Sequence, residues 1–128
     1  MFQVITKGII KKNGKFLVLK RSPNAHAFPG YWDFPGGKLE EDEQPFKAVE
    51  REALEETSLK VKAEKIVSAF AFHDKEHLVF LSFNVKLLGG EVKISGEHTE
   101  WKWVGRKFLL KEKFLEPFIK DLVEKKAI

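Results

Sequence analysis

One stretch, residues 36–59, constrains this chain more than any other. Two glycines open it, and Pro45 follows at a place where its fixed φ suits the first turn of a helix. Phe46, Val49 and Ala53 then recur at helical spacing and form an apolar stripe that a helix can bury. The stretch therefore predicts a loop, a helix that begins at Pro45, and a second loop.

Three carboxylates, Glu52, Glu55 and Glu56, lie close together near the end of this predicted helix. At about 100° per residue they share one sector beside the apolar stripe, with Glu52 one turn before Glu56. Like charges at this spacing destabilise a helix, and a hard divalent cation with oxygen ligands would relieve the repulsion. The alternative is a solvated acidic helix face, which explains most acidic clusters of this kind.

The complete spacing of the stretch favours the metal site over the solvated face. Residues 37–59 resemble the Nudix box of the Nudix hydrolase family, in the loop–helix–loop context that the box requires. Ser58 departs from the family pattern, which normally has glycine there, at a position where glycine would allow a left-handed helix end. The matching positions are Gly37, Glu43, Arg51, Glu52, Ala53, Glu55, Glu56 and Leu59.

The remainder of the chain alternates between strand patterns and turn signals. Strands are predicted over residues 2–12, 15–21, 31–35, 61–73, 77–88 and 101–104, and an amphipathic helix over 114–126. Strands with one helix in mid-chain and one at the end suggest a mixed sheet covered on both faces. The family resemblance implies the same α/β fold, a Nudix-type α/β/α sandwich with a mixed β-sheet, as a single Nudix hydrolase domain over residues 1–128.

The resemblance also implies a chemistry. Nudix enzymes hydrolyse nucleoside diphosphates linked to another group, by attack of water on phosphorus with Mg²⁺ as cofactor; Mn²⁺ is an alternative ion. A pyrophosphate bridge repels an incoming hydroxide, and divalent cations neutralise that charge and lower the pKa of bound water. By the resemblance, Glu52, Glu55 and Glu56 are the acids of the metal site, with Glu55 either a ligand or a supporting group, and the carbonyl group of Gly36 is a further ligand.

The group that accepts the proton of the attacking water varies within the family. It is either a glutamate of the box, here Glu52 or Glu55, or a carboxylate from a later loop. That loop offers Glu97 and Glu100. Glu100 directly precedes the predicted strand over residues 101–104 and is the better match, with Glu97 close behind.

Three further box residues have supporting roles by the same resemblance. Arg51 is expected to pair with the box carboxylates and to hold Glu52 in place for catalysis. Glu43 is expected to tie the glycine loop to the helix. Gly37 lets the backbone pass close to the site.

Substrate contacts are expected from four more residues. Arg21 ends the second predicted strand and could clamp phosphate by bidentate contact, and Lys38 could touch the same group. Phe34 and Phe80 could line a pocket for the base. The alternatives are a surface ion pair for Arg21, solvent exposure for Lys38, and ordinary core positions for the two aromatic residues.

The segment YWDFPGGKLE, residues 31–40, resembles the MutT-like branch of the family. This implies hydrolysis of a nucleoside triphosphate to the monophosphate and pyrophosphate, including the sanitation of oxidised nucleotides. Purine-reading members place asparagine just before a Glu-Pro pair, whereas Leu115 precedes Glu116-Pro117 here and offers no hydrogen bonds. ADP-ribose and dinucleoside polyphosphates remain alternative substrates, and a catalytically silent nucleotide-binding module is the alternative from another class.

Composition bounds the remaining classes of protein. The net charge of +4 is spread over scattered lysines, which fits a small anionic nucleotide, and the interleaved aromatic and basic strand pattern of RNA-binding modules is missing. No apolar run reaches the length of a membrane span, and the absence of cysteine excludes disulfides and thiolate chemistry. We therefore expect a cytoplasmic enzyme, monomeric or homodimeric, with a nucleotide substrate and no nucleic-acid or membrane partner.

Overall fold

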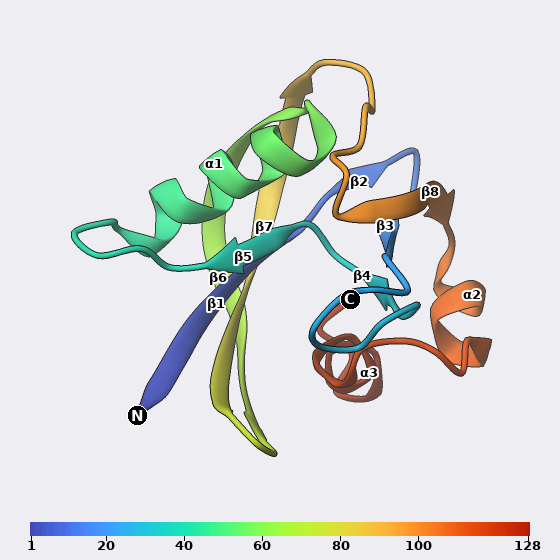
Figure 1. Cartoon of the computed structure of the whole chain (residues 1–128). Coiled ribbons are helices and arrows are strands. Elements are labelled where there is room, and N and C mark those ends of the chain that lie inside the picture. Colours follow the sequence, from blue (N-terminus) through green and yellow to red (C-terminus); the bar gives the residue numbers. More distant parts are fainter.

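The structure is a computed structural model that describes residues 1–128. Its eight strands and three helices are arranged around two sheets (Figure 1). In chain order they are β1 (Phe2–Ile9), β2 (Lys11–Lys12), β3 (Lys15–Arg21), β4 (Trp32–Asp33), β5 (Gly36–Lys38), α1 (Pro45–Thr57), β6 (Lys60–His73), β7 (His77–Gly89), β8 (His98–Val104), α2 (Arg106–Lys111) and α3 (Pro117–Glu124).

The first sheet is mixed and has the strand order β5-β1-β7-β6. β1 runs parallel to β7, from the pair Phe2 and His77 to the pair Ile9 and Asn84, and the other neighbours are antiparallel. The second sheet is antiparallel, with β3 between β4 and β8 and with β2 also on β3. The chain passes from one sheet to the other at Ile10, which is why the single strand predicted over residues 2–12 is divided in two.

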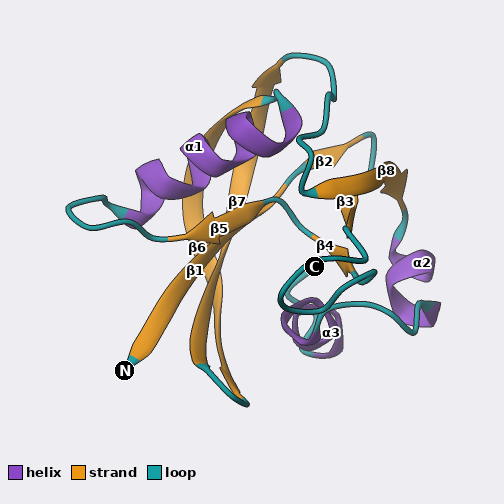
Figure 2. Ribbon diagram, viewed as in Figure 1, coloured by secondary structure: helices purple, strands orange, loops and turns teal.

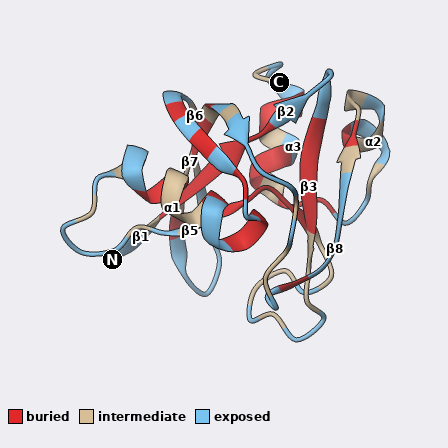
Figure 3. Cartoon of the chain, turned by 90° about the horizontal axis from the view of Figure 1, so that it is seen from above, coloured by how far each residue is buried: buried red, intermediate tan, exposed pale blue.

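Helices cover both faces of the mixed sheet, which confirms the predicted α/β/α sandwich (Figure 2). Alternation along β7 makes this possible, because Leu78 and Phe80 face one buried cluster and Phe83 and Val85 face the other. Figure 3 shows the buried residues gathered where the helices meet the strands. α1 contributes Val49 and Ala53 to one cluster, and α3 contributes Phe118, Ile119, Leu122 and Val123 to the other. No helix is both long and apolar enough to cross a membrane.

The predicted starts of the last helix and of β8 need correction, and one helix was missed. The last helix begins at Pro117 and not at residue 114, because the preceding residues hydrogen-bond to Trp32 of β4, with Phe114 O accepting at 2.7 Å and Glu116 N donating at 3.2 Å. β8 begins at His98, three residues before the predicted start, because it pairs with β3 as far as Arg21. α2 was not predicted, since six residues are too few for a helical period to be visible.

Ser58 ends α1 in the left-handed conformation, with φ 64° and ψ 10°. Its backbone N–H donates to the carbonyl group of Leu54 at 2.9 Å, and its hydroxyl group donates to the carbonyl group of Lys93 at 3.1 Å. A left-handed conformation costs a non-glycine residue about 1–2 kcal/mol. The side-chain hydrogen bond offsets part of this cost, so the helix end that the Nudix box needs is kept with serine in place of glycine.

Candidate active site

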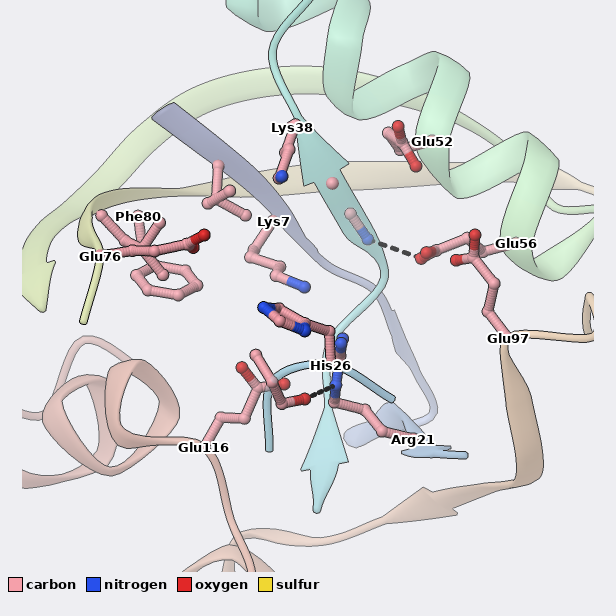
Figure 4. Close-up of a pocket in the computed structure, with 15 residues that line it drawn as sticks. Lys7, Arg21, His26, Lys38, Glu52, Glu56, Glu76, Phe80, Glu97 and Glu116 are labelled. Carbon is pink, nitrogen blue, oxygen red and sulfur yellow. Dashed lines mark hydrogen bonds between the residues drawn. The ribbon is translucent and has the colours of Figure 1, made fainter. Parts of the chain in front are cut away.

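A cavity of about 390 Å³ opens between the two sheets and the buried side of α1, within the usual range for a small-molecule site. Its two ends differ in chemistry. Figure 4 shows Glu52, Glu56 and Glu97 on one side and Phe80 on the other, with Lys7 between them. Two further apolar side chains, Ile5 and Leu78, line the cavity with Phe80. One end can therefore hold cations and the other can hold an apolar ring.

Helical geometry places Glu52 and Glu56 together, since they are one turn apart on the same face of α1. Glu56 is 6% exposed, and its Oε1 accepts a hydrogen bond from the backbone N–H of Gly36 at 2.8 Å. The loop around β5 thus fixes one carboxylate directly. The same loop also lies close to the carboxylate of Glu52. There is room for this carboxylate only because Gly37 has no Cβ atom.

Burial changes the charge state of these two acids. It raises the pKa of Glu56 to about 8, since the nearby Lys7 and the N–H of Gly36 offset the desolvation only in part. Burial likewise raises the pKa of Glu52, against the opposing charge of Arg51. A nearby cation stabilises the ionised form of a buried carboxylate. Carboxylate oxygen atoms are also the ligands that Mg²⁺ and Mn²⁺ prefer. The residues at this end of the cavity therefore fit a divalent metal.

In the metal-free protein, the free energy of unfolding should fall as the pH rises from about 5 to about 8. The pKa of Glu56 is about 8 in the folded protein and ordinarily 4.5. The protonated side chain therefore contributes its full stabilisation below pH 4.5, and this contribution is lost as the pH rises toward about 8. The contribution is on the order of a few kcal/mol. Glu56→Gln should remove it, because an amide does not titrate. Urea denaturation in chelator across this range measures the difference, and equal slopes for the two proteins would contradict it.

Arg51 hydrogen-bonds to three acids, of which only Glu52 lines the cavity. Its guanidinium group forms two hydrogen bonds with Glu43, at 2.6 and 3.0 Å, one with Glu52 at 3.0 Å and one with Glu55 at 3.1 Å. Hydrogen bonds from Arg51 hold the pKa of Glu43 below its ordinary value. Glu55 is 59% exposed at its side chain and does not line the cavity. The structure thus places Glu43 at the junction of loop and helix, and Glu55 outside the group formed by Glu52 and Glu56.

The two adjacent glycines should respond differently to alanine. At Gly36, which has φ of 153°, a Cβ atom would overlap the backbone carbonyl group of Thr6, so Gly36→Ala should lower the free energy of unfolding by about 3 kcal/mol or more. At Gly37, a Cβ atom would lie 2.6 Å from the carboxyl carbon of Glu52, a side chain that can turn away. Gly37→Ala should therefore change stability by about 1 kcal/mol or less but lower metal affinity about tenfold.

Urea denaturation and calorimetric titration of Mn²⁺ distinguish these outcomes. Each variant serves as the control for the other. Gly37→Ala with unchanged metal affinity, or Gly36→Ala with unchanged stability, would contradict the positions of the loop backbone and of Glu52.

The structure separates the two late-loop glutamates. Glu97 lines the cavity, and a carboxylate oxygen of Glu97 lies within 4.8 Å of one of Glu56 and of a ring nitrogen of His98. Glu100 lies within β8 opposite Lys20, whose Nζ is 3.4 Å from its carboxylate, and it does not line the cavity. The sequence pattern favoured Glu100, but the geometry brings Glu97 to the acidic end.

A buried charged cluster at the floor of the cavity was missed by the sequence analysis. Lys7 is 3% exposed, and its Nζ lies 2.9 Å from Oδ2 of Asp33, which also accepts a hydrogen bond from Arg21 at 3.2 Å. Burial and the charge of Asp33 raise the pKa of Glu116 well above its ordinary value, which favours its neutral form. Burial opposes the charge on Asp33, but Lys7, Glu116 and Arg21 together lower its pKa. A lysine within the apolar segment VITKGII was the available signal.

The remaining predicted substrate residues divide into two groups. Arg21, Lys38 and Phe80 line the cavity, although the guanidinium group of Arg21 is engaged by Asp33 and by the carbonyl group of Ala27. Phe34 is completely buried in the core beside Phe118 and does not line the cavity.

Leu115 points into the core as well. Its side chain is completely buried, whereas that of the next residue, Glu116, faces the cavity. The side chain of Leu115 is therefore not at the cavity wall.

The family is defined by comparison with known proteins. A family model for the NUDIX domain matches residues 3–125, and the chain therefore belongs to the Nudix family of hydrolases, which cleave pyrophosphate linkages. Among solved structures, the MutT protein from Methanosarcina mazei Go1 is 30% identical and has a TM-score of 0.91, with 98% of this chain and 93% of that chain covered.

The chain is also similar in sequence to two further proteins. The ADP-ribose pyrophosphatase of Methanocaldococcus jannaschii is 34% identical over 122 residues, which cover 92% of this chain and 71% of the relative. The MutT-like protein of Streptomyces ambofaciens is 32% identical over 96 residues, which cover 75% of this chain. The match spans 58% of the length of that second relative.

Proposed function

We propose that this chain hydrolyses nucleoside triphosphates to the monophosphate and pyrophosphate in a Mg²⁺-dependent reaction. The observation that carries the proposal is one cavity with Glu52, Glu56 and Glu97 at one end and Ile5, Leu78 and Phe80 at the other. Such a cavity matches a nucleotide, which has a polyanionic chain at one end and a flat, largely apolar ring at the other. The similarity to the MutT protein from Methanosarcina mazei Go1 supports the triphosphate branch.

The acidic end would perform the chemistry. Glu52 and Glu56 would hold the cation together with the carbonyl group of Gly36. A bound Mg²⁺ would neutralise phosphate charge and acidify a water molecule. Glu97 would accept the proton of the attacking water. The oxygen of this water would bond to phosphorus while the bridging P–O bond breaks, and the electron pair of that bond would leave on the departing phosphate oxygen.

The basic and apolar residues would bind the rest of the substrate. Lys38 lies at the cavity wall between Phe80 and Glu52 and would contact phosphate oxygens (Figure 4). The ring of Phe80 is held by a stacked contact with Phe118, with centroids 4.8 Å apart and an interplanar angle of 8°. This contact gives the base a rigid apolar wall, and the polar groups of Glu116 and Lys7 lie beside it.

A substrate panel tests the proposal. The protein would be incubated with Mg²⁺ and the common nucleoside triphosphates, 8-oxo-dGTP, ADP-ribose and dinucleoside polyphosphates, and products would be separated by anion exchange. Release of a monophosphate with pyrophosphate is the expected result. Nucleotide binding without turnover on any compound would overturn it in favour of a silent binding module.

ADP-ribose is the second candidate substrate. It is favoured by the relative from Methanocaldococcus jannaschii, an ADP-ribose pyrophosphatase that matches 92% of this chain. The same panel decides, because cleavage of ADP-ribose yields AMP and ribose 5-phosphate and no pyrophosphate. A kcat/KM for ADP-ribose above that for every triphosphate would replace the first proposal with this one.

Glu97→Gln should lower kcat by about 10²–10³-fold, because a general base contributes on this scale and an amide cannot accept the proton. Glu100→Gln is the matched control and should change kcat by less than about twofold, because this exposed residue only pairs with Lys20 at 3.4 Å. Steady-state kinetics at saturating Mg²⁺ compares the two. A larger loss for Glu100→Gln would reverse the assignment.

A further inference from the structure

His98 is a buried polar residue that the chemistry above does not use. It begins β8, opposite Arg21 of β3, and is 5% exposed. Neither Nδ1 nor Nε2 hydrogen-bonds to another protein group. An imidazole carries one donor and one acceptor when neutral, and burial of unpaired polar atoms is unfavourable. The two unpaired ring nitrogens of His98 therefore leave this side chain available to bind a ligand or ion.

Two carboxylates of the acidic end lie near this ring. One atom each from Glu56, Glu97 and His98 lie within 4.8 Å of one another. Two ligands of one first-row divalent ion can be no farther apart than twice the metal–ligand distance, about 4.4 Å. The three atoms are therefore close to the spacing of a shared ion, and Glu97, being exposed, is free to close the remaining distance.

We propose that His98 supplies a nitrogen ligand to the metal centre, beside Glu56 and one carboxylate oxygen of Glu97, whose second oxygen is left to accept the proton of the attacking water. The inference rests on the proposed metal-dependent function and adds a preference for one class of ion. Mg²⁺ takes oxygen ligands almost alone, whereas imidazole suits first-row transition metals. A site with one nitrogen and several carboxylate oxygens should bind Mn²⁺ or Co²⁺ more tightly than Mg²⁺.

Mn²⁺ bound to the chelator-treated full chain, without nucleotide, tests the inference by pulsed electron paramagnetic resonance. Nitrogen coupling typical of a directly bound imidazole is expected for the unchanged protein. His98→Gln should lose this coupling. His26→Ala is the matched control and should keep it, because His26 lines the same cavity but is exposed and is not part of the group with Glu56 and Glu97.

Calorimetric titration gives a second measurement. His98→Gln should weaken Mn²⁺ binding about tenfold to a hundredfold. Mg²⁺ binding should change by less than about threefold, because the glutamine carbonyl group still offers an oxygen. Circular dichroism melting identifies a variant that fails to fold, and the spectrum of the unchanged protein decides the question in that case.

The outcomes separate this inference from the proposed function. Bound Mn²⁺ without nitrogen coupling in the unchanged protein would overturn the role of His98 and leave metal-dependent hydrolysis intact. Coupling that survives in His98→Gln would also overturn it. Failure to bind either ion at millimolar concentration with nucleotide present would overturn both.

Discussion

Glu56→Gln should lower kcat about 10³-fold or more, which corresponds to about 4 kcal/mol of transition-state stabilisation. The carboxylate of Glu56 is the most deeply buried of the box acids and faces the cavity next to Gly36. Glutamine has the same shape and keeps an oxygen that can accept the hydrogen bond from the N–H of Gly36. It cannot supply the negative charge that a bound cation requires. Steady-state kinetics with Mg²⁺ on the best substrate of the panel measures the effect.

The fold should survive this substitution. Because burial raises the pKa of Glu56 to about 8, the metal-free protein at neutral pH already holds this side chain in its uncharged form, which glutamine resembles. Glu64→Gln is the matched control, an exposed glutamate of β6, and should leave kcat unchanged within about twofold. A rate within about tenfold of the unchanged protein for Glu56→Gln would remove Glu56 from the metal site.

Lys7→Met should lower the free energy of unfolding by about 3–5 kcal/mol, because it leaves a buried charge without its partner. Lys7 and Asp33 are 3% and 1% exposed, and Lys7 donates a hydrogen bond to Oδ2 of Asp33 at 2.9 Å. Methionine fills a similar volume, so the loss reports on charge and not on a cavity. Arg21, at 3.2 Å from Asp33, keeps the effect near the lower end of the range.

Urea denaturation at neutral pH measures this loss. Lys47→Met is the matched control, since its side chain is 71% exposed and its ion pair with Glu50 spans 3.6 Å at the surface. The control should change stability by less than about 0.5 kcal/mol. The double variant Lys7→Met, Asp33→Asn should be more stable than the sum of the single changes predicts, because it removes both charges. Additive losses would show that the two residues do not interact.

Much of the helix and its loop could be read from the sequence. Pro45 fixes where α1 begins, and the 3.6-residue period fixes which side of it is buried, so Glu52 and Glu56 were expected on one face. The resemblance to the Nudix box implied that Arg51 pairs with box carboxylates, and the structure contains its hydrogen bonds with Glu43 and Glu52. Arg51 and Glu43 are 8 positions apart in the chain, so a local motif can encode this contact.

Contacts between distant segments could not be read in this way. The choice between Glu97 and Glu100 depends on where β8 begins, and that is set by its pairing with β3 about 80 residues earlier in the chain. The side chain of Leu115 faces the core and that of Glu116 faces the cavity, because the backbone of this segment pairs with Trp32. A one-residue shift in either pairing would exchange the inward and outward side chains.

By itself, the sequence determined the family through the spacing of the box, and the resemblance implied the α/β/α architecture. It also determined the acidic face of α1, because the spacing of neighbouring residues encodes it. Only the tertiary structure decided which acids meet at the cavity, that Phe34 belongs to the core, and that Lys7, Asp33 and Glu116 form its charged floor. The reason is physical. Burial and charge at one point depend on segments brought together by sheet pairing, and no local pattern carries that information.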